Sequence, residues 1–87
     1  MYYVYTLKSK HAKKMYIGYT HDLRTRISEH NKGHSPATKP YAPFCLIYYE
    51  AYKCKKDACA REKQLKQYKQ AWTRLKERIR FSLEEQN

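Results

Sequence analysis

Two short segments at the start of the chain constrain its fold more than any other feature. Residues 2–7 and residues 15–20 are dominated by aromatic, β-branched and other apolar residues, which is typical of β-strands. The residues between them, 8–14, include four lysines and no apolar residue larger than alanine, so they are expected to form a loop. The chain therefore predicts a β-hairpin with a fairly long connection.

A helix is expected to follow this hairpin. Thr20 or Asp22 can cap its N-terminus, and Leu23 and Ile27, four residues apart, can face the core. Gly33 suits the cap at its C-terminal end. Together these signals predict the first helix and both of its ends.

The middle of the chain predicts a loop, a third strand and a second helix. Residues 34–43 contain all three prolines and little apolar content, so they are expected to form the loop. Residues 44–52 predict a strand that is apolar enough to lie centrally in a small sheet. The second helix is expected to run from Asp57 to about Tyr68, and it offers three residues for packing: Ala58, Ala60 and Leu65.

The end of the chain predicts a further helical segment, on which four apolar residues recur three or four positions apart: Trp72, Leu75, Ile79 and Leu83. The predicted fold class is therefore α+β, a small three-stranded antiparallel sheet flanked by helices in the order β-β-α-β-α-α. A chain of 87 residues without a linker or internal repeat has room for one domain. That domain is expected over residues 1–83, with residues 84–87 as a frayed tail.

Charge gives the first indication of function. Lysine and arginine together number 19 and aspartate and glutamate 8, so the net charge is +11. Such an excess of one sign favours a polyanionic partner, above all nucleic acid. A membrane surface fits less well, because no segment pairs a basic face with an exposed apolar one. An ordinary basic protein with a solvated surface is the simpler alternative.

No sequence feature indicates export or a structural zinc. The chain opens without a secretory signal pattern, and its longest apolar stretch, residues 44–49, is far too short to cross a bilayer, so a cytoplasmic location is expected. The three cysteines never form a C-x-x-C pair, and no such pair precedes the H-x-x-x-H of His30 and His34. We therefore expect reduced thiols and no structural zinc.

The scarcity of acidic residues limits the kind of hydrolase that this chain could be. Hydrolysis of a phosphodiester needs an activated water, a cation on the phosphate oxygens and usually a divalent metal. A two-metal centre needs several clustered carboxylates, whereas the eight acidic residues here are scattered, without a D-x-D or D-x-E pair. A phosphodiester hydrolase of this composition is expected to use one metal held by very few carboxylates.

Four sequence fragments, in the expected order, resemble the GIY-YIG nuclease family. Residues 3–5 (YVY) and residues 16–18 (YIG) resemble its two named motifs, residues 16–31 resemble the second motif running into its arginine helix, and residues 60–66 (AREKQLK) resemble its acidic helix. The resemblance covers nearly the whole chain, and it is closest to short stand-alone members without a separate DNA-binding domain. It implies a metal-dependent endonuclease that hydrolyses phosphodiester bonds in DNA or RNA.

The resemblance implies a role for five residues. Tyr5 and Tyr16 would line the active site, with Tyr5 orienting or deprotonating the attacking water. Arg26 would bind the phosphate, His30 would assist or contact the leaving group, and Glu62 would hold one divalent ion, Mg²⁺ or Mn²⁺. A guanidinium suits its role because it offers a planar fork to phosphate oxygens. A tyrosine has an ordinary pKa of about 10, so Tyr5 would need nearby cations to ionise at neutral pH.

Each of these residues also has a simpler explanation. The two tyrosines can be ordinary half-buried strand aromatics, and Arg26 can be one of many surface cations. His30 can pack against the hairpin from the end of its helix. Glu62 can form an i,i+4 ion pair with Lys66, which contributes about 0.3–0.5 kcal/mol on an exposed helix.

The chain departs from the family pattern at two positions. The leading glycine of the Gly-Ile-Tyr motif is absent, because the motif reads Tyr3-Val4-Tyr5 here. Some branches place a lysine directly after the glycine of the second motif, where this chain has Tyr19, which argues against a lysine-assisted mechanism. Gly18 itself is assigned to geometry, because it lets the backbone pass close to the site or bulge.

Six cations are expected to contact the phosphates of a nucleic acid: Arg24, Lys32, Lys39, Arg61, Lys63 and Lys66. Such contacts carry no sequence information, and no helix-turn-helix, zinc finger or RNA-binding strand motif supplies base recognition. We therefore expect low sequence specificity and DNA rather than RNA as the main partner. Substrate shape, a protein partner or a second copy of the chain would then decide the target.

Two other functions stay open from the sequence. One is a nucleic-acid-binding module of the same fold with weak or lost catalysis, and the other is an interaction domain whose basic face docks an acidic protein. The intact set of candidate catalytic residues favours the nuclease. Steep salt dependence of DNA binding would separate the two alternatives.

Overall fold

The computed structural model describes residues 1–85. Its elements in chain order are β1 (Tyr2–Ser9), β2 (Met15–Thr20), α1 (Leu23–Asn31), the 3-10 helix η1 (Lys39–Tyr41), β3 (Phe44–Tyr52), α2 (Lys55–Gln67), α3 (Lys69–Arg78) and α4 (Arg80–Glu84). A three-stranded antiparallel sheet with helices around it confirms the predicted α+β class and order of elements.

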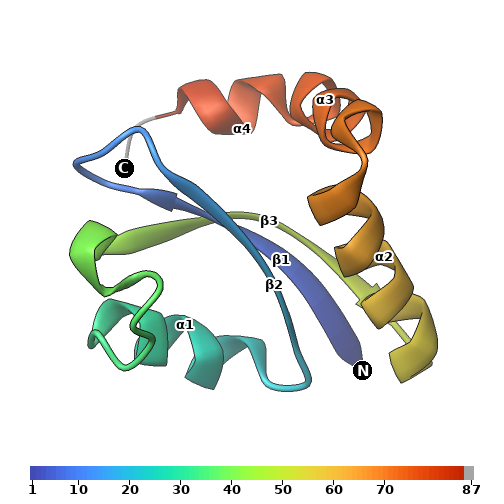
Figure 1. Cartoon of the computed structure of the whole chain (residues 1–87), viewed down its shortest axis with the longest axis horizontal. Helices are drawn as coiled ribbons and strands as arrows, with labels where there is room; N and C mark the ends of the chain where they lie inside the picture. The colour runs from blue at the N-terminus through green and yellow to red at the C-terminus, as the bar shows by residue number, and fades with distance from the viewer. Residues whose placement is uncertain (86–87) are drawn as a thin grey trace.

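The strands lie in the order β2-β1-β3, so the central strand is β1 (Figure 1). The expectation that the strand at residues 44–52 lies centrally is therefore wrong. Within the hairpin, β2 pairs antiparallel with one edge of β1, and β3 pairs antiparallel with the other edge. The central position gives β1 four consecutive buried residues, 4–7, because it has a strand on each side and helices over both faces.

Helices pack on both faces of the sheet and form two hydrophobic clusters. On one face, Leu23 and Ile27 of α1 pack against Tyr5 and Leu7 of β1. Figure 1 shows α2 on the opposite side of the sheet from α1. The buried cluster on that side joins β1 to α2, to α3 and to the residue between α3 and α4, and it consists of Val4, Ala58, Leu65, Leu75 and Ile79.

The ends of α1 follow the predicted signals. The Asp22 side chain accepts a hydrogen bond from the backbone N–H of Thr25 at 3.2 Å, which confirms Asp22 as the N-cap. Gly33 follows the helix with a φ of +77°, and its N–H donates to the carbonyl of His30 at 3.1 Å. A residue with a side chain would be strained in this left-handed conformation, which is why glycine suits the position.

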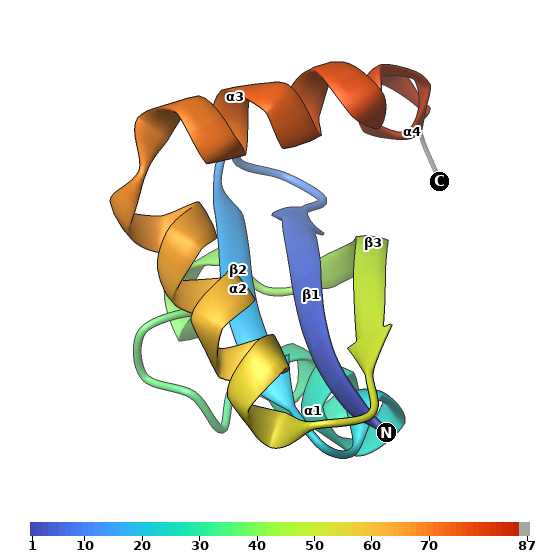
Figure 2. The same cartoon turned by 90° about the vertical axis from the view of Figure 1, so that its right-hand side faces the viewer.

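The helices after β3 differ from expectation in three respects. α2 begins at Lys55 rather than Asp57, because Cys54 is its N-cap and the backbone carbonyl of Cys54 accepts a hydrogen bond from the N–H of Asp57. Ala60, expected to pack, is exposed. The last helical segment is divided at Ile79 into α3 and α4, and Figure 2 shows both lying across one end of the sheet.

Three further expectations concern the C-terminal tail, the cysteines and a membrane-spanning helix. The predicted frayed tail falls partly on α4, whose last residue is Glu84, while residues 86–87 lie outside the described residues. The three cysteines form no disulfide. Within residues 1–85, no helix combines the length and apolar character that a bilayer crossing requires.

Candidate active site

The five side chains singled out from the sequence come together in space, although they belong to β1, β2, α1 and α2. The ring centroids of Tyr5 and Tyr16 lie 6.4 Å apart, and those of Tyr16 and His30 lie 4.9 Å apart. Arg26 and Glu62 are both close enough to affect the ionisation of Tyr5. The strands β1 and β2 thus place two phenols, α1 an imidazole and a guanidinium, and α2 a carboxylate around one site.

The Tyr5 hydroxyl is held by a chain of buried hydrogen bonds. It faces Nε2 of His30 at 2.9 Å, and Nδ1 of His30 lies 2.8 Å from the hydroxyl of Thr38. Thr38 donates to the carbonyl of Ser35 at 3.4 Å, so it accepts from His30. Nδ1 of His30 therefore carries the proton, and Nε2 accepts the hydrogen bond that Tyr5 donates.

Burial sets the protonation of both rings. Tyr5 is 1% exposed and His30 is 0% exposed. Burial raises the pKa of Tyr5 to about 12, Tyr16 and Glu62 add to this rise, and Arg26 opposes it. Burial also lowers the pKa of His30, and the positive charge of Arg26 lowers it further. Both groups are therefore neutral at pH 7 in the free protein.

Gly18 provides the space that the Tyr5 ring occupies. It lies opposite Tyr5 in the β1–β2 pairing, and the tyrosine ring lies directly over it. A Cβ atom at Gly18 would overlap the hydroxyl and Cζ of Tyr5 and would lie 2.9 Å from its Cε1. The geometric role predicted for Gly18 thus takes a definite form, a close approach between backbone and ring.

Arg26 lies one turn before His30 on α1. Its Nη1 donates to Glu29 at 3.4 Å, and the two side chains are 37% and 43% exposed. The neighbouring Tyr5 is the main cause that raises the pKa of the arginine. An ion pair of this length and exposure contributes little, so the guanidinium can be transferred to a phosphate at small cost.

Glu62 is half-buried and pairs with Lys66, the ion pair expected if it has no catalytic role. The distance between Lys66 Nζ and Glu62 Oε2 is 3.1 Å, and the glutamate side chain is 24% exposed. Lys66 Nζ also lies 5.6 Å from the centroid of the Tyr16 ring, which brings it to the edge of the site. Glu62 can therefore form its ion pair with Lys66 and still lie beside the tyrosines of the site.

The donor set allows a metal ion only if most of its ligands come from water and substrate. Among residues 1–85, no group of three or more His, Cys, Asp or Glu side chains is arranged to hold a metal. Mg²⁺ suits a site of this kind, because it often keeps several waters and binds through one or two carboxylates plus phosphate oxygens. Glu62 can supply such a carboxylate.

The predicted phosphate-binding cations occupy different environments. Exposed positions are taken by Arg24, Lys32, Lys39, Lys63 and Lys66. Arg61 is instead fixed against β3, where its Nε and Nη2 donate to Glu50 at 3.0 and 3.1 Å.

Thr38, which bonds to His30, was not singled out from the sequence. No local pattern marks it, because its role arises only when the proline-containing loop folds back over the end of α1.

Comparison with known proteins identifies the family. The profile described as "GIY-YIG catalytic domain" matches residues 1–76. The chain belongs to the GIY-YIG family. It is also similar to proteins named UPF0213 from Staphylococcus aureus strains Mu3, Mu50 and N315, at 38% identity over 68 residues, which cover 77% of this chain and 82% of each relative. No solved structure matches the chain.

Family membership carries a general activity. GIY-YIG catalytic domains are endonuclease domains, they act on nucleic acid and they generally use a divalent metal. The names of the staphylococcal relatives state no activity or substrate.

Proposed function

We propose that this protein is a one-metal endonuclease that hydrolyses phosphodiester bonds, mainly in DNA and with low sequence specificity. The observation that supports this most is the convergence of Tyr5, Tyr16, Arg26, His30 and Glu62 from four elements. Binding of phosphates by a basic surface requires cations, and it does not require a carboxylate and two phenols beside a buried imidazole.

In this proposal Tyr5 receives the proton that the attacking water loses. Its own proton passes to Nε2 of His30, the acceptor that it already faces at 2.9 Å, and the imidazolium keeps its hydrogen bond to Thr38. No free phenolate is needed, which matters because burial raises the pKa of Tyr5 to about 12. Tyr16 is half-buried at the solvent border and would orient the water.

This route changes the role proposed for His30. Both ring nitrogens of His30 already face Tyr5 and Thr38, so neither is free to contact a leaving group. His30 therefore acts through Tyr5, as a positioning residue and proton acceptor. The simpler explanation for His30 is packing at the end of α1. The contacts with Tyr5 and Thr38 that pack the ring there would also serve the proposed proton transfer.

Arg26 and Glu62 would bind the phosphate and the metal. Arg26 would exchange its weak contact with Glu29 for the non-bridging oxygens of the phosphate. Glu62 would hold one Mg²⁺ or Mn²⁺ ion, and such an ion, when bound, neutralises charge that develops on the phosphate. Lys66, 46% exposed, can then turn from Glu62 toward the nucleic acid.

The test is cleavage of supercoiled plasmid and of branched and single-stranded DNA and RNA oligonucleotides, with Mg²⁺ or Mn²⁺ and with EDTA. Glu62→Ala and Arg26→Ala should each reduce cleavage by about 100-fold or more, since each removes charge stabilisation in the transition state. Glu77→Ala and Arg80→Ala are matched controls, because they remove the same charges from exposed positions on α3 and α4. The controls should cleave at the wild-type rate.

Cleavage that persists in EDTA or in both site variants would contradict this mechanism. If the wild type cleaves none of these substrates but binds them, the alternative function follows, a nucleic-acid-binding module of the same fold. Glu62 paired with Lys66 and Tyr5 kept neutral would then be its resting arrangement.

A further inference from the structure

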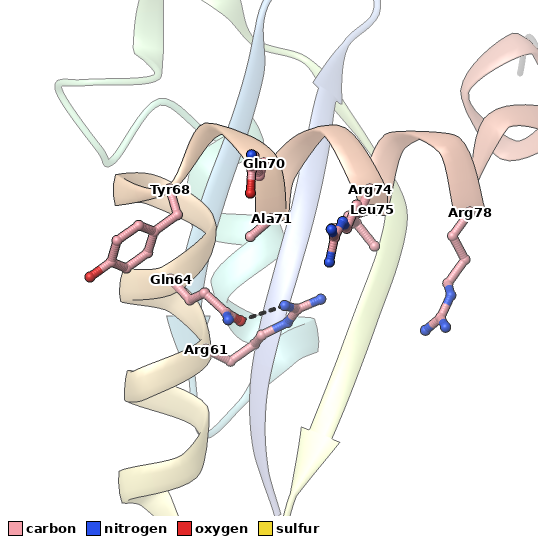
Figure 3. Close-up of a pocket in the computed structure, with 8 residues that line it drawn as sticks. All are labelled: Arg61, Gln64, Tyr68, Gln70, Ala71, Arg74, Leu75 and Arg78. Carbon is pink, nitrogen blue, oxygen red and sulfur yellow. Dashed lines mark hydrogen bonds between the residues drawn. The ribbon is translucent and has the colours of Figure 1, made fainter.

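We propose that an arginine-lined groove between α2 and α3 is a second contact for nucleic acid, which binds backbone phosphates away from the candidate active site. Its polar lining consists of Arg61, Gln64, Tyr68, Gln70, Arg74 and Arg78, and no acidic side chain lines it (Figure 3). The inference rests on the proposed function only in taking nucleic acid as the ligand. It does not depend on catalysis.

One arginine of the groove is held in place by β3. Arg61 is bonded to Glu50 through Nε and Nη2, and its Nη1 donates to Gln64 at 2.6 Å. The hydroxyls of Tyr48 and Tyr52 also donate to Glu50, so both oxygens of this carboxylate accept hydrogen bonds from the tyrosines and from Arg61. Arg61 thus forms a fixed wall, and its charge is largely balanced by Glu50.

The other two arginines are not balanced in this way. Arg74 and Arg78 lie one turn apart on α3, both are exposed, and neither forms an ion pair with another residue of the described range 1–85. Figure 3 shows both side chains leaving the same side of α3, toward the side on which Arg61 reaches from α2. Two guanidinium forks at this spacing can bind successive phosphates or two oxygens of one phosphate.

The groove lies on a different side of α2 from the active site. Arg61, Gln64 and Tyr68 recur at three and four residues on the side toward α3 and β3. Glu62 and Lys66, also one turn apart, lie on the side toward Tyr16 of β2. Nucleic acid bound in the groove would therefore contact α2 on its other flank, without covering the candidate metal ligand.

A nucleic-acid strand fits the groove better than a free anion does. Tyr68 is 62% exposed and borders the arginines, so it offers an aromatic face on which a base or sugar can stack. Gln64 and Gln70 add side-chain amides that can donate to phosphate or sugar oxygens. The net charge of +11 favours the same class of ligand over a neutral one.

The test measures binding of a fluorescent DNA duplex and single strand in EDTA, where no cleavage occurs. Arg74→Ala combined with Arg78→Ala should weaken binding about tenfold or more and should reduce the slope of log affinity against log salt by about 2. Arg61 is left unchanged, because removing it would leave the Glu50 carboxylate without its main partner. Lys10→Ala combined with Arg80→Ala removes the same charge from exposed positions outside the groove.

The control pair should weaken binding about twofold or less, and thermal unfolding should show that both double variants fold. Equal losses in the two double variants would overturn the proposal, because binding would then follow overall charge alone. Inorganic phosphate that binds as tightly as the oligonucleotides, and only when Arg74 and Arg78 are present, would also overturn it in favour of a free-anion site. Failure of cleavage would affect only the proposed nuclease reaction.

Discussion

At the scale of single residues, Gly18 decides whether Tyr5 can occupy its place. We predict that Gly18→Ala destabilises the protein by about 1–3 kcal/mol, because a Cβ atom cannot share space with the Tyr5 ring. The displaced ring should also lose its contact with His30, so cleavage by the folded fraction should fall. Chemical denaturation and cleavage assays at matched folded concentration measure the two effects.

Gly33→Ala is the comparison for this change. It strains a residue with a φ of +77°, so it should destabilise the protein by about 1 kcal/mol. Gly33 follows α1, and the atoms nearest to a Cβ added there belong to the Lys39 side chain rather than to Tyr5, so cleavage by the folded fraction should be retained. A Gly18→Ala protein as stable and active as the wild type would show that the ring does not need this space.

His30 predicts a dependence of stability on pH. Burial lowers its pKa below the ordinary value of 6.5, so the unfolded chain binds a proton at a pH where the folded chain does not. The free energy of unfolding should therefore decrease as the pH falls below about 6.5. Glu50, whose folded pKa is lowered from 4.5, loses its contribution only at lower pH, so the interval between these values reports on His30.

His30→Gln should flatten the stability curve in this interval, as measured by urea denaturation at a series of pH values. His34→Gln is the control, because His34 is exposed and should leave the curve unchanged. A wild-type curve that is already flat between pH 6.5 and 4.5 would contradict the neutral, buried state of His30.

The sequence identified five residues that the structure brings together, but it could not assign all of their contacts. Tyr5, Arg26 and Glu62 were selected by the resemblance of short sequence motifs to the GIY-YIG family, because residue type and motif spacing are local properties of the chain. The burial of His30 and its bond to Thr38 depend on a loop eight residues away folding back over α1. No periodicity in the loop encodes that contact.

At the scale of elements, α2 is attached to the sheet through Arg61. We predict that Arg61→Ala lowers the free energy of unfolding by about 2–3 kcal/mol, because it leaves the Glu50 carboxylate, 15% exposed, without its cation. Lys63→Ala removes an exposed cation from the same helix and should cost less than about 0.5 kcal/mol. Equal costs in urea denaturation would show that the Arg61–Glu50 pair does not stabilise the fold.

Element types followed from the sequence more closely than element positions did. Aromatic, β-branched and apolar content identified the strands, helical spacing identified the helices, and Thr20 and Asp22 were the two candidates for the start of α1, of which Asp22 is the N-cap. The position of β3 at the edge was not encoded in its own apolar character, because strand order depends on which edge of β1 the hairpin leaves free. The break between α3 and α4 at Ile79 could not be predicted either, because the helical spacing of apolar residues continues through this position.

At the scale of the whole molecule, the charge of +11 predicts that nucleic-acid binding is electrostatic. Affinity for a DNA duplex should fall steeply between 50 and 200 mM salt, by about 10³-fold if six phosphates are contacted. Fluorescence anisotropy at a series of salt concentrations, in EDTA, measures this slope. A nearly flat slope would favour the third function considered, docking to an acidic protein through specific contacts.

The sequence by itself determined the fold class, the family and the kinds of side chain available for chemistry. It did so because hydrophobic periodicity, capping residues and motif spacing act over a few residues along the chain. Only the tertiary structure decided the strand order, the buried Tyr5–His30–Thr38 chain, the engagement of Arg61 by Glu50 and the groove that contains Arg74 and Arg78. These features arise from contacts between distant segments, and burial, which sets the protonation of Tyr5 and His30, exists only once those segments have packed.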